Sequence, residues 1–281
     1  GEASLGVKYR EVDADGNVQG GVMYYIQNGL GSSWKWLAVV YALLAGLAAF
    51  GIGNMVQANT MSQALQEGFN VPTYITGILA VVLVGAVVLG GIKRIAQTAE
   101  KIVPFMTVVY VVGALVILVL NVDKIPAAFA DIFHYAFNPY SATGGIVGWA
   151  IAARYGVARG IFSNEAGLGA ASIVHAQAKN SPTGQGMWGI WEVFIDTIIV
   201  CTMTSLVILV SGALGTLDAA GDAVTGGALA SEAFSRGLPG PGGTLVLLAL
   251  TLFSYTTMLT WCFYGEKSWE YIFGNKVVIL Y

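Results

Sequence analysis

Residues 156–179 read GVARGIFSNEAGLGAASIVHAQAK, a stretch that places polar groups inside an otherwise apolar segment. Glu165 is followed by two glycines, Gly167 and Gly169, which disfavour a continuous helix. Non-helical backbone is tolerated at membrane depth only where it is buried in protein or lines a watery cavity. Ionisable residues inside a membrane span usually mark a substrate or ion path. The stretch therefore predicts a discontinuous helix at a binding site.

The composition is that of a membrane protein. Hydrophobic residues make up 56% and charged residues 10% of the 281 residues, whereas a soluble domain has about 25% charged residues. The 37 glycines suit close contacts between helices in a membrane. A net charge of −3 does not favour nucleic acid as a partner. Cys201 and Cys262 lie in apolar runs, and we interpret them as buried small residues rather than a disulfide.

Six apolar runs predict membrane spans. They lie near residues 36–60, 73–90, 102–121, 147–176, 188–212 and 244–264. A spanning helix needs about 20 predominantly apolar residues, so the run at 147–176 is too long and too interrupted for one plain helix. We expect two half-helices there, joined by an irregular turn near Ser163–Gly169.

Both ends of the chain look cut. The chain opens without a Met and stops inside a fresh apolar run, VVILY at 277–281, which would begin a seventh span. We expect residues 1–281 to form a single all-α integral membrane domain that is incomplete at both ends. Residues 1–33 read as a polar lead-in with a turn at Asp15–Gly16.

The basic residues are distributed unevenly between the two sides of these spans. Most lysines and arginines fall in or next to residues 1–33, 91–101, 177–187 and 265–276. The positive-inside rule places these four segments in the cytoplasm. The outer loops would then be residues 61–72, 122–146 and 213–243.

The broken span offers free backbone groups to ligands. A half-helix N-terminus presents N–H groups to anions, and freed carbonyls suit a cation. Secondary transporters place their sites at such discontinuous helices. In the alternative interpretation, Glu165 is a buried structural acid paired with Arg154 or Arg159. Even in that alternative the helix is interrupted, so the interruption remains a candidate binding site.

A second candidate is GIGNMVQANT at residues 51–60. Asn54 and Gln57 are three residues apart and share one helix face. A glutamine amide both donates and accepts hydrogen bonds, which suits a zwitterionic ligand held without a fixed countercharge. The two amides equally fit a structural role in which they join neighbouring helices.

A third candidate is FSYTTMLTW at residues 253–261. Thr256 and Thr257 supply hydroxyls, and hard cations such as sodium take oxygen ligands. The alternative is that each hydroxyl bonds the carbonyl four residues back in its own helix. Trp261 would be either an aromatic lid over a site or an anchor at the membrane interface.

Two carboxylates, Glu192 and Asp196, are spaced i, i+4 in the fifth span. Such a pair can relay protons. We favour a charge brace instead, in which they pair with Arg154 or Arg159 on the broken span. We assign no chemistry to His175.

Several stretches carry a more specific pattern: GGVMYYIQNGLG (20–31), GIGNMVQANT (51–60), GVARGIFSNEAGLGAASIVHA (156–176), FIDTIIVCTMTSLVI (194–208) and YGEKSWEYIFG (264–274). They resemble the sodium:alanine symporters, the alanine/glycine:cation symporter family. The resemblance runs over nearly the whole chain, and SNEAGLG is specific in that context.

The resemblance implies a LeuT-type fold, in which two five-helix inverted repeats carry unwound first and sixth core helices at the substrate. This chain would run from the cytoplasmic end of core helix two to the start of core helix nine. The broken span would be core helix six. The first core helix, which supplies much of the substrate and sodium sites in this fold, would lie outside the chain.

The resemblance also implies roles for single residues. Gln57 looks like a contact to the polar group of the substrate, with Asn54 beside it. Trp261 looks like the aromatic wall that limits side-chain size. Thr256 and Thr257 match hydroxyls that flank the sodium site. Three consecutive residues of the unwound sixth helix would shape the pocket floor: Ser163, Asn164 and Glu165.

We therefore expect a secondary transporter rather than an enzyme. It would couple Na⁺ to the uptake of alanine or glycine by alternating access, with no organic cofactor. We expect a monomer surrounded by lipid in the plasma membrane of a bacterium or archaeon. One open alternative is a proton-coupled amino-acid transporter that uses Glu165 or the Glu192–Asp196 pair. A remote one is an intramembrane enzyme or a channel, although the sequence holds no HExxH motif.

Overall fold

Apolar helices dominate the structure, a computed structural model that describes residues 1–13, 16–138, 145–218, 221–238 and 240–275. In chain order the elements are α1 (Glu2–Lys8), β1 (Glu11–Val12), β2 (Val18–Gln19), α2 (Val22–Leu30), η1 (Ser32–Trp34), α3 (Lys35–Ala48), η2 (Ala49–Met55), α4 (Val56–Phe69), α5 (Thr73–Val88), α6 (Gly91–Leu120), η3 (Val122–Lys124), α7 (Ile125–Phe137), α8 (Gly145–Asn164), α9 (Ala171–His175), α10 (Pro182–Val193), η5 (Phe194–Cys201), α11 (Thr202–Val210), α12 (Gly226–Gly237) and α13 (Pro241–Phe273).

Within these described residues, four helices are long and apolar enough to cross a membrane. They are Ser32–Gln66, Gly91–Leu120, Pro182–Val210 and Gly242–Phe273. A fifth helix, α5, is apolar but shorter. The chain is thus a helical, multi-pass membrane protein. The structure also contains a short antiparallel hairpin that the sequence did not indicate, in which Glu11 of β1 pairs with Gln19 of β2.

Two of the long helices contain a π-helical segment near their middle. The segment η2 joins α3 to α4, and η5 joins α10 to α11. A π turn widens the helix by one residue and redirects the side chains on either side of it, and such turns are frequent at functional sites. The predicted candidates Asn54 and Asp196 lie in η2 and η5, respectively.

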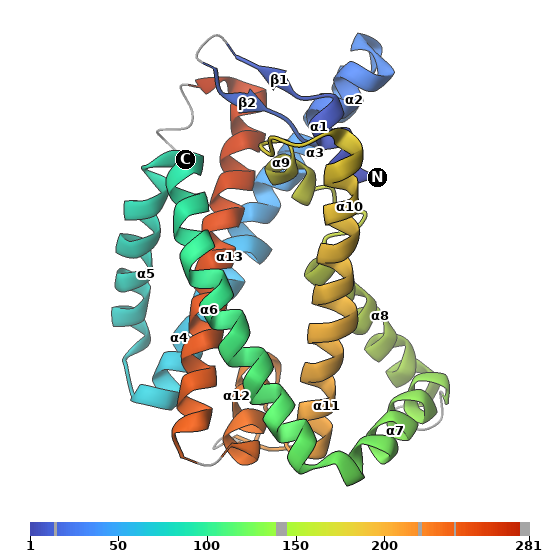
Figure 1. The fold of residues 1–281 in the computed structure, drawn as a ribbon, viewed down its shortest axis with the longest axis vertical. Helices are drawn as coiled ribbons and strands as arrows, with labels where there is room; N and C mark the ends of the chain where they lie inside the picture. Colours follow the sequence, from blue (N-terminus) through green and yellow to red (C-terminus); the bar gives the residue numbers. More distant parts are fainter. Residues whose placement is uncertain (14–15, 139–144, 219–220, 239, 276–281) are drawn as a thin grey trace.

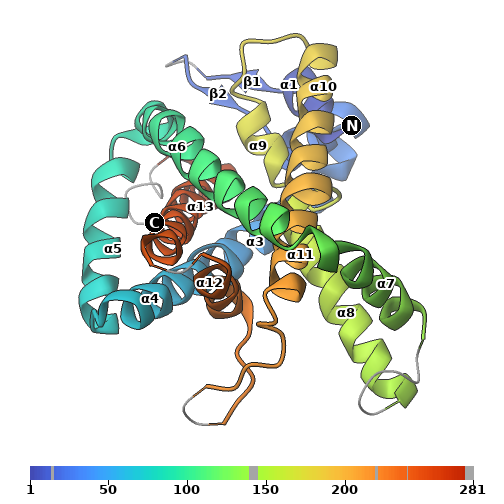
Figure 2. The same ribbon diagram turned by 60° about the horizontal axis from the view of Figure 1, so that its bottom comes forward.

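The helix α13 forms the centre of the larger group of helices. It packs against α3, α4, α5, α6 and α12 (Figure 1). A second group, made of α1, α9 and α10, packs together at the end of the molecule that carries the hairpin. The helices α7 and α8 extend away from both groups (Figure 2). No described residue of α8 is fully buried.

The buried side chains form two main clusters. One joins α6, α11 and α12 around Ile117, Val207 and Phe234. The other joins α2, α9 and α13 around Met23, Ile173 and Phe263, and it also contains Trp261. Close packing rather than removal from water holds helices together in a membrane. The second cluster is the frame on which the candidate site is built.

Several predicted loops are helical instead. The helix α6 begins at Gly91 and runs through Pro104, and α13 continues to Phe273. Charged side chains near the membrane surface are compatible with a helix, and Lys267 bonds Glu270 one turn later at 2.6 Å. The other predicted loops contain the end of α4, α7, the start of α10 and α12, and the lead-in contains α1, β1, β2 and α2.

Two predicted features fall wholly or partly outside the described residues. The expected turn includes Asp15, which lies outside them, whereas Gly16 has φ +81° in the connection from β1 to β2. The expected seventh span at 277–281 also lies outside them. The hairpin, the start of α10 and the end of α13 lie at one end of the molecule, and α7 and α12 lie at the other (Figure 1).

Candidate functional site

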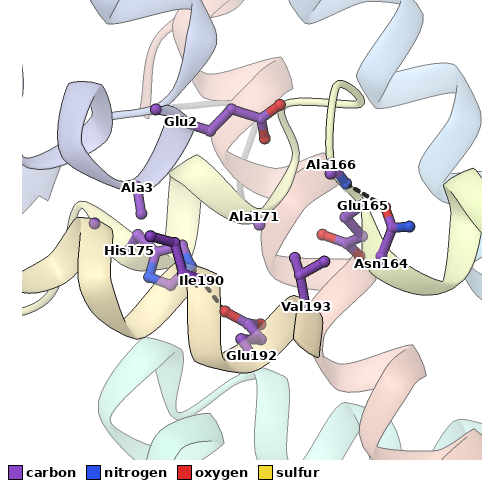
Figure 3. Close-up of a pocket in the computed structure, with 13 residues that line it drawn as sticks. Glu2, Ala3, Asn164, Glu165, Ala166, Ala171, His175, Ile190, Glu192 and Val193 are labelled. Carbon is purple, nitrogen blue, oxygen red and sulfur yellow. Dashed lines mark hydrogen bonds and ion pairs between the residues drawn. The ribbon is translucent and has the colours of Figure 1, made fainter. Parts of the chain in front are cut away.

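The chain leaves the helical path between α8 and α9. Glu165, Gly167 and Gly169 have φ values of +55°, +86° and +84°, in the left-handed region that side chains disfavour. The local side chains replace the lost helical bonds: Asn164 Oδ1 accepts from the Ala166 amide at 2.8 Å (Figure 3). The interruption thus has a defined local structure, at the place where the glycines predict it.

Groups from distant elements hold the interruption in place. Glu2 Oε1 accepts from the Gly167 amide at 2.6 Å, and the Tyr41 hydroxyl donates to the Leu168 carbonyl at 3.2 Å. Gly169 is buried, and a Cβ atom there would collide with α2 and lie 3.1 Å from the Tyr41 hydroxyl. Gly169 is therefore required both by its backbone conformation and by the space around it.

Glu165 turns toward α13 rather than toward an arginine. Its Oε2 atom accepts a hydrogen bond from the Tyr264 hydroxyl at 3.2 Å, and Tyr264 is buried. Within the part of the chain that the structure describes, neither Arg154 nor Arg159 forms an ion pair with Glu165. The Glu165 carboxylate therefore connects the interruption to the central helix α13 through a hydrogen bond from the neutral Tyr264 hydroxyl.

Trp261 is where three elements meet. Its indole is 3% exposed and stacks on Phe162 of α8 with ring centroids 5.8 Å apart. Tyr264 meets it edge-on at 5.3 Å. Gly53 of η2 lies directly against it, since a Cβ atom there would be 2.5 Å from the indole Cγ. We call Gly53, Phe162, Trp261 and Tyr264 the Trp261 junction.

The two predicted amides lie next to this junction on η2 and α4. Asn54 Nδ2 donates to the Ala49 carbonyl at 2.7 Å, across the π turn, and Asn54 Oδ1 accepts from Cys262 Sγ at 3.4 Å. Gln57 is half-buried. Its amide has no hydrogen-bond partner among the residues that the structure describes. Asn54 thus braces the π segment, whereas the amide of Gln57 forms no hydrogen bond with the described residues.

The two predicted sodium hydroxyls are engaged within their own helix. Thr256 Oγ1 donates to the Leu252 or Phe253 carbonyl at 3.1 or 3.0 Å, and Thr257 Oγ1 donates to Phe253 at 2.9 Å. These are the internal bonds that the alternative interpretation of this span expects. A hydroxyl that donates in this way keeps lone pairs, so these contacts are compatible with cation binding without requiring it.

The predicted charge brace has different partners. Glu192 Oε2 lies 3.0 Å from His175 Nε2, and Asp196 Oδ2 accepts from Ser163 Oγ at 2.6 Å. Arg159 forms no ion pair with either carboxylate among the described residues. The interruption brings Ser163 and His175, rather than an arginine, up to α10 and η5, which explains the difference.

A cavity of about 330 Å³ opens beside the interruption. It is bounded by α1, the chain at 164–166, α9 and α10 (Figure 3). Its polar lining includes Glu2, Asn164, Glu165, His175 and Glu192. Three predicted site residues, Asn164, Glu165 and Glu192, therefore line this cavity, whereas Trp261 and Asn54 do not.

Sequence reasoning missed several residues of this arrangement. Tyr264 follows Trp261 by three residues and so lies on the same side of α13, a signal that was present in the sequence. No such signal links His175 to Glu192, because only the fold brings them together.

Comparisons with known proteins identify the family of the chain. A family model described as the sodium:alanine symporter family matches residues 1–281. The chain is 46% identical to an uncharacterized transporter of Haemophilus influenzae and 44% identical to the sodium/alanine symporter AgcS of Methanococcus maripaludis, each over 100% of this chain and 61% of the relative. It is 34% identical to the probable sodium/glutamine symporter GlnT of Bacillus subtilis, over 99% of this chain and 56% of the relative.

The chain spans about three fifths of the length of these relatives. The family model nevertheless covers every residue, including the interruption and the Trp261 junction. The chain belongs to the sodium:alanine symporter family.

Proposed function

We propose that the protein containing this chain is a sodium-coupled symporter of small neutral amino acids such as alanine and glycine. The observation that carries the proposal is the Trp261 junction, where η2, the broken end of α8 and α13 converge. An interrupted helix and the polar side chains beside it provide hydrogen-bonding groups of the kind that a zwitterion needs. The family membership supports the same function.

The junction also bears on substrate size. Trp261 is fixed on both sides, by Phe162 and by the backbone at Gly53, so the indole does not move aside readily. A snug wall of this kind discriminates by about 1–3 kcal/mol per added methylene. A relative is named for glutamine, and we propose that contacts of this sort favour a smaller substrate in this chain.

Individual residues take the following roles in the proposal. Gln57 contacts a polar group of the amino acid, with Asn54 fixing the π segment beside it. The pocket floor is shaped by Ser163, Asn164 and Glu165. Thr256 and Thr257 offer hydroxyl lone pairs to sodium. These roles need no organic cofactor.

The mechanism in this proposal is alternating access in a LeuT-type inverted repeat. Sodium binding orders the interruption and raises the affinity for the amino acid, and by linkage the amino acid raises the affinity for sodium equally. We further propose a monomer in the plasma membrane, with residues 1–33 in the cytoplasm.

Uptake of radiolabelled alanine by proteoliposomes that hold the full-length protein tests this function. We expect accumulation with an inward sodium gradient at fixed pH, and a loss of uptake in Gln57→Ala. Uptake that persists without sodium and collapses with a protonophore would replace the proposal by a proton-coupled transporter that uses Glu165 or the Glu192–Asp196 pair.

A further inference from the structure

The hairpin of β1 and β2 contacts α9, the short helix that follows the interruption. Arg10, the residue before β1, donates from Nη1 to the Ala176 carbonyl at 2.7 Å and to the Ala178 carbonyl at 2.6 Å. Ala176 is the residue that caps the end of α9. The last carbonyls of a helix have no partner within the helix, and a cationic side chain there is favourable. Arg10 forms no ion pair among the residues that the structure describes, so its charge is directed at the end of α9.

Two further hydrogen bonds join the beginning of the chain to the segment after the interruption. Gln177 Nε2 donates to the Val18 carbonyl of β2 at 3.0 Å. At the other end of the segment, Glu2 of α1 accepts from the Gly167 amide. The segment is therefore held by hydrogen bonds at both of its ends.

The same contact is close-packed between these bonds. A Cβ atom at Gly6 would be 2.6 Å from the Ser172 carbonyl oxygen, and a Cβ atom at Gly20 would be 2.3 Å from Ala176 Cβ. Surfaces that leave no room even for a methyl group do not slide past one another gradually. The helix α1, the hairpin and α9 are thus packed as one unit.

The hairpin is also fixed on the central helix α13 (Figure 1). Gln19 Nε2 of β2 donates to Glu270 Oε1 at 2.7 Å, and Glu270 Oε2 accepts from Lys267 Nζ at 2.6 Å. All three side chains are buried. Removing one partner from a buried charge pair leaves an uncompensated charge, which is strongly unfavourable, so this attachment is firm. The hairpin therefore forms a polar bridge between α9 and α13.

We propose that Arg10 is a positioning residue for the interruption, because it holds α9 in the position relative to α13 that the amino-acid site requires. Arg10 acts on the amino acid only through α9. Without its guanidinium, α9 occupies additional positions, and the interruption adopts the binding arrangement for a smaller fraction of the time. The apparent dissociation constant rises by the reciprocal of that fraction. This inference rests on the proposed function and adds a residue to it.

The test measures binding of radiolabelled alanine to the purified full-length protein at saturating sodium, in the parent and in Arg10→Gln. The binding curve gives the dissociation constant and the number of sites separately. We expect a dissociation constant about 10-fold higher, the change that corresponds to the loss of a hydrogen bond to a charged group, with an unchanged number of sites. A merely structural role would lower the number of sites and leave the dissociation constant of the folded molecules unchanged.

Matched variants separate the position of the charge from the charge itself. Lys8→Gln removes the same charge two residues earlier, from an exposed side chain that lies over the Tyr9 ring at 5.0 Å, and should leave the dissociation constant unchanged. Arg10→Lys keeps the charge and should recover most of the affinity. If Arg10→Gln does not fold, Gln177→Met removes the bond to Val18 instead. It should raise the dissociation constant about 5-fold, because the lost hydrogen bond is neutral.

Hydrogen exchange without amino acid gives a readout that is independent of the substrate. The backbone amides of residues 171–178 should exchange faster in Arg10→Gln than in the parent, because α9 opens more readily. Unchanged exchange there would overturn the positioning role.

The outcomes also distinguish the two proposals. A parent protein that binds no alanine at saturating sodium would overturn the proposed function, and with it the role of Arg10 in binding. A parent that binds alanine, with an equal dissociation constant in Arg10→Gln, would overturn the positioning role alone. A lower dissociation constant in Arg10→Gln would also overturn it, because Arg10 would then favour an arrangement that does not bind.

Discussion

The Trp261 junction and the chain between α8 and α9 lie close together but are held by different forces. The junction is a contact of three rings and a glycine, without a charged group. The interruption is held by side-chain hydrogen bonds: Glu2 accepts one, and Tyr41 and Tyr264 donate one each, Tyr264 being shared with the junction. Packed interiors resist gradual deformation, whereas individual hydrogen bonds contribute only about 0.5–1.5 kcal/mol each. We infer that the junction sets the shape of the site and that the interruption is the part that rearranges during transport.

The largest expected effect concerns the junction. Trp261→Ala removes a buried indole and should lower the free energy of unfolding by about 3–5 kcal/mol. It should also let larger amino acids such as glutamine compete for alanine uptake. Melting temperature in detergent and competition against radiolabelled alanine measure the two effects.

Trp269→Ala is the matched control on the same helix. Trp269 stacks on Phe273 at 5.9 Å, away from the junction, so its loss should reduce stability without widening the substrate range. An unchanged substrate range in Trp261→Ala would contradict the role given to the junction.

A second prediction contrasts two glycines of the interruption. Gly167→Ala places a side chain in open space, so it should cost only the left-handed strain of about 1–2 kcal/mol. Gly169→Ala carries the same strain and also collides with α2, which adds about 1–3 kcal/mol. Thermal unfolding and alanine uptake should both rank parent, Gly167→Ala and Gly169→Ala in that order. Equal effects of the two variants would mean that the contact with α2 is unimportant.

A third prediction concerns the hydrogen bond between α13 and Glu165. Tyr264→Phe removes it and should cost about 1 kcal/mol of stability, with a lower maximal rate of alanine uptake because the interruption loses a contact. The control is Tyr255→Phe, which removes a bond of the same 3.2 Å length from α13 to the Leu83 carbonyl. A drop in uptake rate of equal size in both variants would mean that the hydrogen bond between Tyr264 and Glu165 has no specific role in transport.

The smallest effect on stability is expected at Thr257. Its hydroxyl bonds its own helix, so Thr257→Val should change the free energy of unfolding by no more than about 1 kcal/mol. The sodium requirement of uptake should rise if its lone pairs contact the ion. Thr251→Val removes an equivalent bond to the Leu247 carbonyl on the same helix, and its sodium dependence should match that of the parent.

The sequence predicts the helical membrane class, the family and the position of the interruption, because these depend on local signals: apolar runs, glycines after Glu165 and the motif SNEAGLG. It does not predict the partners of charged groups. An arginine of the neighbouring broken span, Arg154 or Arg159, is the natural partner for Glu192 when only the order of the spans is known. The interruption changes that by bringing His175 to Glu192 and Ser163 to Asp196.

The two π-helical segments could not be predicted from the sequence either. Both η2 and η5 continue α-helices whose residues have ordinary helical patterns, and the choice of an i, i+5 bond depends on packing. Residues 91–101 and 265–273, which were predicted to lie outside the spans, are helical because charged residues at a membrane surface do not end a helix by themselves. Helix ends follow from capping and steric breaks rather than from polarity alone.

The most direct test of the account is radiolabelled alanine uptake into proteoliposomes that hold the full-length protein, measured with and without an inward sodium gradient at fixed pH. The account predicts accumulation above equilibrium only with sodium, and a loss of that accumulation in Gln57→Ala. Equal uptake in the two conditions, or full sodium-driven uptake in Gln57→Ala, would contradict it.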